Sequence, residues 1–340
     1  MTQLHQLRYF LPPRSKKVTC PACDQPKRFK LYHDATTGHP VGDAYGRCDR
    51  QDHCGYDLRP QSDKPPERSA NAFRDLPPAP PKPLAILPEE VVAASLAHHR
   101  ANNLARMLGR IIGYGQANEL LLGMEVGTSS HWPGATVFFQ RDEYGRPRSG
   151  QVVHFDSQSG KTIKDLAPNG EKRRRTTWLH KTTKKAFKRK GEPFPQWLKD
   201  YEEAEQVSGW LFGLRYVLAA AKTVPVGIVE APKTALLCNA FLPTYRWAAT
   251  CGLGNLTETR LRPLLDRKIE LFPDASENGS ALAHWQNKAE QLRRKGFQVT
   301  VNERLETLAT PEQLCAGYDL ADVILDNHRG YPPSWDNDTL

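Results

Sequence analysis

Four cysteines near the start of the sequence have the spacing of a metal site. They form a Cys-x2-Cys pair in CPAC and a Cys-x5-Cys pair in CDRQDHC, with 24 residues between the pairs. The four are Cys20, Cys23, Cys48 and Cys54. Zinc prefers four tetrahedral ligands, and a Cys-x2-Cys pair closes a tight turn over the ion while a second pair completes the site. The pattern predicts one structural Zn²⁺ in a small zinc ribbon, with Cys54 or its neighbour His53 as the fourth ligand.

The same segment has residues that suit it to nucleic acid. Lysines and arginines between positions 16 and 30 are interleaved with Phe29, Tyr32 and Tyr45. Cations hold phosphates, and aromatic faces stack on the bases of a single strand. The alternative interpretation is a solvated basic face without a partner.

Two acidic residues follow apolar runs farther along the chain. VGIVE ends at Glu230 and IELFPD ends at Asp274, and both runs have the composition of buried strands in a parallel sheet. The carboxyl ends of such strands meet at one edge, where ligands of open α/β sheets bind. Two carboxylates at that edge suit Mg²⁺ or Mn²⁺, which take oxygen ligands. Each carboxylate alone has an alternative role as a charge partner for a helix N-terminus.

Lys233 adds to this predicted edge. It lies in the first turn of the helix that Pro232 begins, where a cation opposes the helix dipole. We therefore expect it to have a partner, such as Glu230 or a phosphate. The loop CGLGN, after the intervening strand, brings backbone N–H groups to the same edge.

A strongly basic stretch precedes the predicted parallel sheet. KRRRTTWLHKTTKKAFKRK, residues 172–190, contains ten Lys or Arg and no acidic residue. Such a stretch neutralises phosphates, and its aromatic residues can stack on bases. The alternative is a solvated loop. The candidate contacts to nucleic acid or nucleotide are Arg148, Lys161, Lys172, Arg173, Arg174, Arg175, Trp178, Lys181, Lys184 and Lys185.

Pattern and composition predict the elements that position these residues. Residues 59–88 contain nine prolines and are predicted to be an extended linker. Residues 89–126 have helical periodicity, and two strands are expected around the turn 142–145. Residues 161–200 lack a clear period and are expected to be irregular. From about residue 207 short apolar strands alternate with helices, which predicts an α/β fold with a parallel sheet.

Bulk properties set broad limits. The 340 residues carry a net charge of +9, which favours a polyanionic partner. No run of about 18 apolar residues is present and the first residues lack a signal segment, so we expect a cytoplasmic protein without a membrane span. Seven cysteines, an odd number, argue against a disulfide framework. The scattered Cys238, Cys251 and Cys315 are interpreted as small buried hydrophobic residues.

Several motifs resemble a known family. VGIVEAPKTALL resembles the first motif of the Toprim fold, CGLGN its glycine loop, and LFPDAS its Asp-x-Asp position. ATVFFQRDEYGRPRSGQVVHFD and WLFGLRYVLAAAK resemble segments that precede Toprim in DnaG-type bacterial primases. YGRCDRQDHCGY resembles a zinc-binding N-terminus found on Toprim proteins of mobile elements.

The resemblance implies an architecture. It comprises a Toprim-type parallel sheet, a preceding mixed α+β primase-like subdomain and a small zinc-ribbon β module. The implied segments are a zinc ribbon at 1–58, a linker at 59–88, a primase-like subdomain at 89–206, a Toprim domain at 207–328 and a tail at 329–340.

The resemblance also implies residue roles. Glu230 would bind metal or act as acid or base, Asp274 would be the first metal aspartate, and Lys233 matches the motif lysine. Ser276 stands in the second aspartate position, and Glu277 is the candidate to replace it at the metal. GYDLADVILD, with Asp319 and Asp322, resembles the closing helix of such domains and is interpreted as structural.

Three functions are therefore compared. The first is a primase-like nucleotidyltransferase that uses Mg²⁺ or Mn²⁺, single-stranded DNA and nucleoside triphosphates, with a replicative helicase as a further candidate partner. The second is a non-catalytic single-stranded DNA-binding protein with a degenerate Toprim fold. The third, which the primase-like segments disfavour, is a Toprim nuclease.

Overall fold

The computed structural model describes residues 8–12, 15–50, 54–60, 83–167, 170–204 and 210–328. The chain divides into two compact units, Met1–Pro81 and Lys82–Leu340. Some predictions fall elsewhere: His53, most of the linker 59–88 and the tail 329–340 lie outside the described residues. In the part of the chain that the structure describes, no helix is both long and apolar enough to cross a membrane.

The small unit is built from short antiparallel strands. Strands β2 (Phe29–Leu31), β4 (Gly46–Cys48) and β5 (Asp57–Leu58) form one sheet, and β1 (Tyr9–Phe10) pairs with β3 (His33–Asp34). Phe29 is fully buried and packs with Cys20 and Cys48. Strands β2 and β4 thus pair antiparallel, with Phe29 opposite Cys48.

The large unit begins with helices, as its periodicity predicts. They are α1 (Glu89–Leu96), the 3-10 turn η1 (His99–Ala101), α2 (Asn103–Ile112) and α3 (Tyr114–Gly123). Asn102 caps α2, because the backbone N–H groups of Leu104 and Ala105 donate to its side-chain oxygen at 2.9 and 3.2 Å.

An antiparallel sheet follows the helices. Its strand order is β11-β8-β7-β6, formed by β6 (Val126–Ser129), β7 (Ala135–Arg141), β8 (Pro147–Val153) and β11 (Thr176–Trp178). The strands on either side of the predicted turn 142–145 are thus confirmed as β7 and β8.

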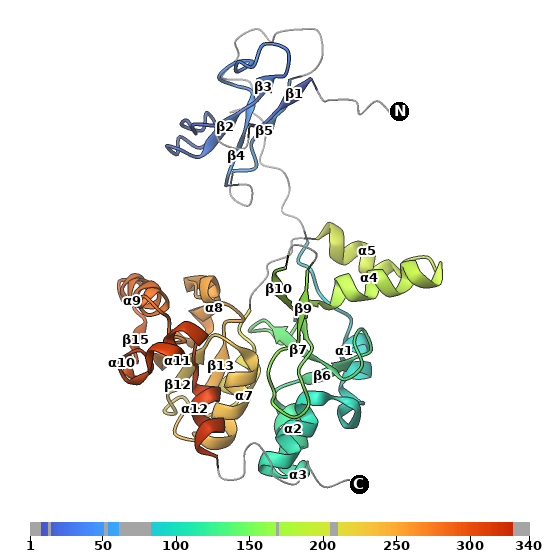
Figure 1. Cartoon of the computed structure of the whole chain (residues 1–340), viewed down its shortest axis with the longest axis vertical. Helices are drawn as coiled ribbons and strands as arrows, with labels where there is room; N and C mark the ends of the chain where they lie inside the picture. The colour runs from blue at the N-terminus through green and yellow to red at the C-terminus, as the bar shows by residue number, and fades with distance from the viewer. Residues whose placement is uncertain are drawn as a thin grey trace. The chain divides into compact units, whose positions relative to one another are not determined.

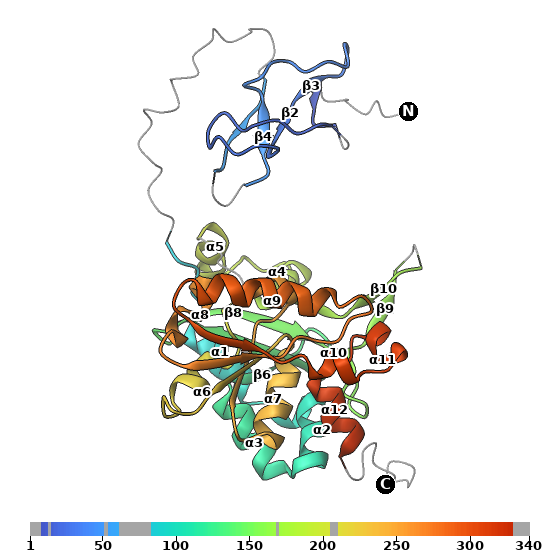
Figure 2. The same cartoon turned by 90° about the vertical axis from the view of Figure 1, so that its left-hand side faces the viewer.

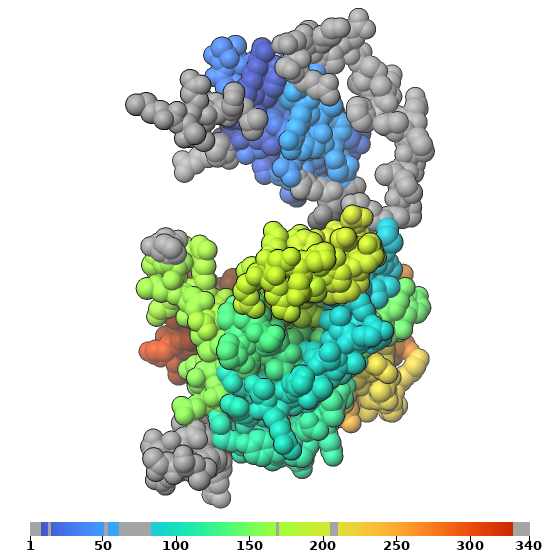
Figure 3. All heavy atoms as spheres, turned by 90° about the vertical axis from the view of Figure 1, so that its right-hand side faces the viewer, coloured from blue at the N-terminus to red at the C-terminus, as the bar shows by residue number. Residues whose placement is uncertain are grey.

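The basic stretch is regular, so the expectation of irregular structure at 161–200 is wrong. Strand β9 (Lys164–Leu166) pairs antiparallel with β10 (Lys172–Arg174), both exposed, and α4 (Leu179–Lys190) and α5 (Gln196–Glu203) follow β11. A few apolar residues anchor the helices, since Leu179 and Leu198 are buried while the cations face solvent. Figure 3 shows α4 and α5, in yellow-green, on one face of this unit.

The C-terminal half is the predicted α/β alternation. Four parallel strands have the order β13-β12-β14-β15. They are β12 (Val226–Val229), β13 (Arg246–Ala249), β14 (Lys268–Leu271) and β15 (Gln298–Val301). The elements around them are α6 (Leu214–Leu218), α7 (Pro232–Phe241), η2 (Leu253–Asn255), α8 (Glu258–Leu261), η3 (Arg262–Leu264), α9 (Ser280–Arg293), α10 (Arg304–Leu308), α11 (Pro311–Ala316) and α12 (Leu320–Asn327).

Phe212 joins the two sheets. Its backbone bridges Gln140 of β7 on one side and Ala249 of β13 on the other, with N–O distances of 2.9 and 3.0 Å to Ala249. Helices α2, α3, α7 and α12 share one apolar core on one face, and α8 and α9 contribute to a second core on the other face. Figures 1 and 2 show α9 and α7 on opposite faces of the parallel strands.

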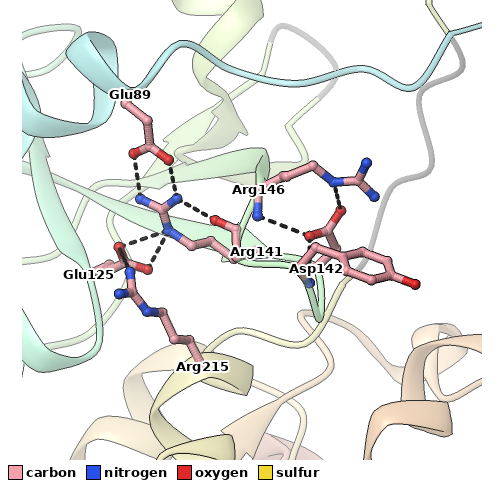
Figure 4. Close-up of polar contacts among 8 residues, drawn as sticks. Glu89, Glu125, Arg141, Asp142, Arg146 and Arg215 are labelled. Carbon is pink, nitrogen blue, oxygen red and sulfur yellow. Dashed lines mark hydrogen bonds and ion pairs between the residues drawn. The ribbon is translucent and has the colours of Figure 1, made fainter.

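A buried arginine ties the first helix to the antiparallel sheet. Arg141 at the end of β7 contacts Glu89 of α1 at 2.5 Å and Glu125, which precedes β6, at 2.7 Å (Figure 4). Arg215 of α6 reaches the same Glu125 at 3.5 Å. Because Arg141 is only 6% exposed, the two carboxylates replace the water that its guanidinium loses on folding.

Candidate functional site

The four predicted zinc ligands come together in the small unit. Their sulfur atoms all lie within 4.8 Å of one another, with Cys20 Sγ to Cys54 Sγ at 3.7 Å and Cys23 Sγ to Cys48 Sγ at 4.0 Å. A tetrahedral ion with Zn–S bonds of about 2.3 Å requires sulfurs about 3.8 Å apart. The cluster therefore fits Zn²⁺, and it contains Cys54 as the fourth cysteine.

One thiol of this cluster favours the thiolate that zinc needs. A hydrogen bond from the backbone of Gln25 lowers the pKa of Cys23 to about 7. Burial instead raises the pKa of Cys54 to about 12. A bound Zn²⁺ would supply the positive charge that keeps all four sulfurs deprotonated.

The two predicted acids lie at the carboxyl edge of adjacent parallel strands. Glu230 follows β12 directly, and Asp274 lies three residues after β14. The strands pair in register from Val226 and Ile269 onward, which brings their ends to the same level. Sequence reasoning thus located this pair correctly relative to the sheet.

Electrostatics show that the two carboxyl groups sense each other. Burial and then the charge of Glu230 are the largest causes that raise the pKa of Asp274 to about 9. Burial also raises the pKa of Glu230 to about 6, against a hydrogen bond from the Asp274 backbone N–H. Such perturbed carboxyl groups in one place are typical of functional sites.

Two further acids join them from α12, and the sequence had suggested only a structural role for these. Asp319 raises the pKa of both Glu230 and Asp274, after burial, and Asp322 acts on Asp274 in the same direction. Asp319 is buried and also caps α12. The group Glu230, Asp274, Asp319 and Asp322 is hereafter the acidic cluster.

Hydrogen bonds hold α12 against the strand ends. Thr234 Oγ1 of α7 donates to Asp319 Oδ2 at 2.6 Å, and the Ala275 N–H donates to the Tyr318 carbonyl at 2.8 Å. About 45 residues separate these acids from LFPDAS, so no local pattern in the sequence indicates this contact. Its one sequence signal is the pair of acids in GYDLADVILD.

Ser276, in the position of the second motif aspartate, has a local structural role. Its side-chain oxygen accepts from the Ala281 N–H at 3.0 Å at the start of α9, and its own N–H donates to Glu306 at 3.1 Å. The neighbouring Glu277 is exposed. Among the described residues, only the four cysteines form a group of three or more His, Cys, Asp or Glu side chains whose ligand atoms all lie within 4.8 Å of one another.

Two cations border the acidic cluster. Burial and then the charge of Asp319 raise the pKa of Asp322, and the charge of Lys233 lowers it. Arg174, at the end of β10, opposes the rise that burial causes in the pKa of Asp274. One predicted phosphate contact, Arg174, therefore acts electrostatically on one of the predicted metal acids.

The other predicted basic contacts differ in exposure. Arg148 is 2% exposed, and its guanidinium donates to the Ala85 carbonyl at 2.8 Å and lies 3.4 Å from Asp142. Lys184 pairs with Glu202 at 2.7 Å. The remaining contacts are exposed or half-buried: Lys161, Lys172, Arg173, Arg175, Trp178, Lys181 and Lys185. Their role in binding stays a prediction.

Residues 102–275 match the family model described as a domain of unknown function, DUF6371, and this match spans just over half of the chain. The chain belongs to the DUF6371 family. Residues 7–67 match a second model, described as a zinc beta-ribbon finger. No curated protein matches the chain.

Solved structures with similar folds include several primases. The chain is similar to the primase fragment of the bacteriophage T7 primase-helicase, with 13% identity, a TM-score of 0.39 and coverage of 92% of this chain and 96% of that chain. It is similar to the RNA polymerase domain of Mycobacterium tuberculosis primase DnaG, with 13% identity, a TM-score of 0.42 and coverage of 72% and 79%. The E. coli primase catalytic core has 14% identity, a TM-score of 0.35 and coverage of 72% and 71%.

The DUF6371 range contains only part of the acidic cluster. It extends from the start of α2 to Ala275, so it contains Glu230 and Asp274. Asp319 and Asp322 lie beyond its end. The DUF6371 match therefore includes the strands that carry the first two acids but not the helix that completes the cluster.

Proposed function

We propose that this DUF6371 protein is a primase-like enzyme. Its large unit would join nucleotides on a single-stranded DNA template at a Toprim-like site that uses Mg²⁺ or Mn²⁺. The observation that carries the proposal is the acidic cluster at the carboxyl edge of the parallel sheet, where burial and like charges raise the pKa of Glu230 to about 6 and of Asp274 to about 9. Acids held together at such cost are suited to a divalent cation.

The donor set fits this type of ion. Mg²⁺ takes oxygen ligands and commonly uses one or two carboxylates together with waters and substrate phosphates. Glu230 and Asp274 would be its ligands, with Glu277 as a further candidate. When bound, the ion would polarise the phosphoryl oxygens and stabilise the charge that develops on them.

The neighbouring side chains would handle the substrate. Lys233 and Arg174 flank the acids and would neutralise triphosphate oxygens, since both already act electrostatically on members of the cluster. The pKa of Glu230, about 6, is close to the range in which a carboxylate accepts a proton efficiently at neutral pH. As the alternative to binding the ion, Glu230 would accept the proton of the attacking hydroxyl group.

The remaining predicted contacts would hold the template. The exposed cations of β10 and α4 would neutralise backbone phosphates, and the zinc ribbon would add charge and aromatic faces on its own unit. A replicative helicase as partner and carriage by a mobile element belong to this same proposal.

One observation favours a second function, a non-catalytic single-stranded DNA-binding protein. Ser276 has no carboxylate to offer, and its hydroxyl oxygen is occupied by the Ala281 N–H. Such a protein would bind DNA equally well after the acids are neutralised. A Toprim nuclease, the weakest of the three candidates, would instead nick plasmid DNA in the presence of Mg²⁺.

The decisive experiment is primer synthesis by the full chain on single-stranded DNA with nucleoside triphosphates. We expect a product that needs Mg²⁺ or Mn²⁺ and disappears in Glu230→Gln and in Asp274→Asn. The matched control is Glu290→Gln, which removes one exposed carboxylate on α9. Product that persists in both acid variants would overturn the catalytic assignment. Unchanged DNA binding without any turnover would support the second function.

A further inference from the structure

A group of aromatic rings and cations lies in the large unit where loop 130–134 and helix α4 pack together. The rings of His131 and Trp132 meet edge to face with centroids 4.4 Å apart. Trp132 also stacks on His154, with centroids 5.9 Å apart and 5° between the ring planes. Trp132 packs against the same apolar cluster as Leu179, the first residue of α4, so the loop and this helix are held together.

Helix α4 presents a line of cations. Lys181, Lys185 and Arg189 are spaced four residues apart, which places them on one side of the helix, and all three are exposed or half-buried. None of them forms an ion pair with another described residue, whereas Lys184 and Lys190 pair with Glu202 and Glu192. This side of α4 therefore has uncompensated positive charge.

The charges of two of these cations act on His131, whose neighbour Trp132 packs in the same apolar cluster as the first residue of α4. Burial lowers the pKa of His131, and the charges of Lys185 and Arg189 lower it further. Among the described residues, no acidic group offsets their effect on this pKa. His154, by contrast, has the guanidinium of Arg175 at 3.2 Å, and the charge of Arg175 is balanced by the carboxylate of Asp165 at 2.8 Å. Like charges gathered without a counter-charge produce a field that attracts an anion.

We propose that His131, Lys185 and Arg189 bind a backbone phosphate of single-stranded nucleic acid. The proposal deepens the primase-like function and rests on it for the choice of nucleic acid as the partner. Position supports that choice, because Arg174 acts on Asp274 of the acidic cluster while the next residue, Arg175, contacts His154 of the ring group. Two consecutive residues of the chain thus connect the acidic cluster with the ring group.

The test is the salt dependence of binding, measured by fluorescence anisotropy of a labelled oligothymidylate with the full chain. Removing one cation that neutralises a phosphate of a single strand lowers the slope of log Kobs against log salt by about 0.7. Lys185→Ala/Arg189→Ala removes both cations from the one phosphate they share and should therefore lower the slope by about 0.7. Arg262→Ala/Arg294→Ala removes the same charge from exposed residues elsewhere and should leave the slope unchanged.

The imidazole provides a second readout. A bound phosphate would raise the pKa of His131, so binding should strengthen as the pH falls through the histidine range. His131→Ala should lose this dependence, and the ring resonances of His131 should shift when the oligonucleotide is added. An equal slope for the α4 double variant and the wild type would overturn the proposal, and so would tighter binding of ATP or inorganic phosphate than of the oligonucleotide.

This test separates the phosphate site from the catalytic proposal. Glu230→Gln/Asp274→Asn should retain the wild-type salt slope while losing primer synthesis. If synthesis is absent in the wild type but the α4 variant still lowers the slope, the catalytic function fails and the phosphate site stands. If synthesis is present and the slope does not change, the phosphate site fails alone.

Discussion

Removing the charge of Glu230 should stabilise the protein. The pKa of Glu230 is raised from 4.5 to about 6, mainly by burial. A hydrogen bond from the Asp274 backbone lowers it, and the charge of Asp319 raises it. Below the unfolded-state pKa both states are protonated and the group costs nothing. As the pH rises the unfolded chain loses its proton first, so a penalty on the folded state grows and is complete above the folded-state pKa.

The size of the effect follows from the shift. A rise of about 1.5 pKa units corresponds to about 2 kcal/mol at neutral pH, at 1.36 kcal/mol per unit. Glu230→Gln keeps the shape and the hydrogen-bond acceptor but removes the charge. At about 2–4 °C per kcal/mol for a unit of this size, its Tm should rise by roughly 4–8 °C at neutral pH and change little near pH 4.

Tryptophan fluorescence is a clean assay for this prediction. All seven tryptophans of the sequence belong to the unit Lys82–Leu340, so a thermal melt followed by their emission reports that unit. The melt is run in chelator and then with Mn²⁺, which should stabilise the wild type and not Glu230→Gln. Glu290→Gln is the control. A lower Tm for Glu230→Gln at neutral pH, or an equal gain at low pH, would refute the electrostatic reasoning.

Three other changes test the supports of the fold and the zinc site. Asp319→Ala removes the α12 cap and the acceptor of the buried Thr234 hydroxyl and should cost about 3 kcal/mol in urea unfolding. Asp319→Asn keeps the oxygen that caps α12 and places an NH2 donor against the Thr234 hydroxyl oxygen, so it should cost less than half of that. Arg141→Met leaves Glu125 without its main partner and should cost about 3 kcal/mol in the same assay. Cys54→Ser should lower bound zinc below one ion per chain by atomic absorption without moving the tryptophan transition.

Much of the fold was predictable where the sequence has one clear hydrophobic period. Helix α7 begins at Pro232 and ends at Phe241, as the sequence pattern predicts, because proline suits the first helical position and the strand before it is a continuous apolar run. The regular structure of residues 161–200 was not predicted, because the few buried residues among the many charged ones give no clear hydrophobic period. Helix α4 is attached by only three buried side chains, Leu179, His180 and Thr182, while its other positions are mostly polar.

The site was predictable only as far as the sheet edge. Glu230 and Asp274 each end an apolar run, and parallel strands bring such ends together. Asp319 lies on a helix that no local pattern connects to that edge, so its position depends on the tertiary contact with Thr234. His131 gave no signal either, because a single loop histidine acquires its significance only from the helix packed beside it.

The cluster changes what the serine at position 276 implies. In the motif alone, Ser276 means one carboxylate fewer, and a divalent ion should bind more weakly. In the folded chain, α12 supplies Asp319 and Asp322 to the same edge, and both raise the pKa of Asp274 after burial. The negative charge that position 276 lacks is therefore present from another element, while the Ser276 hydroxyl anchors the start of α9. For the proposed site, loss of the motif aspartate is thus a weak argument against metal binding, and the charge of the whole edge would determine the affinity for the ion.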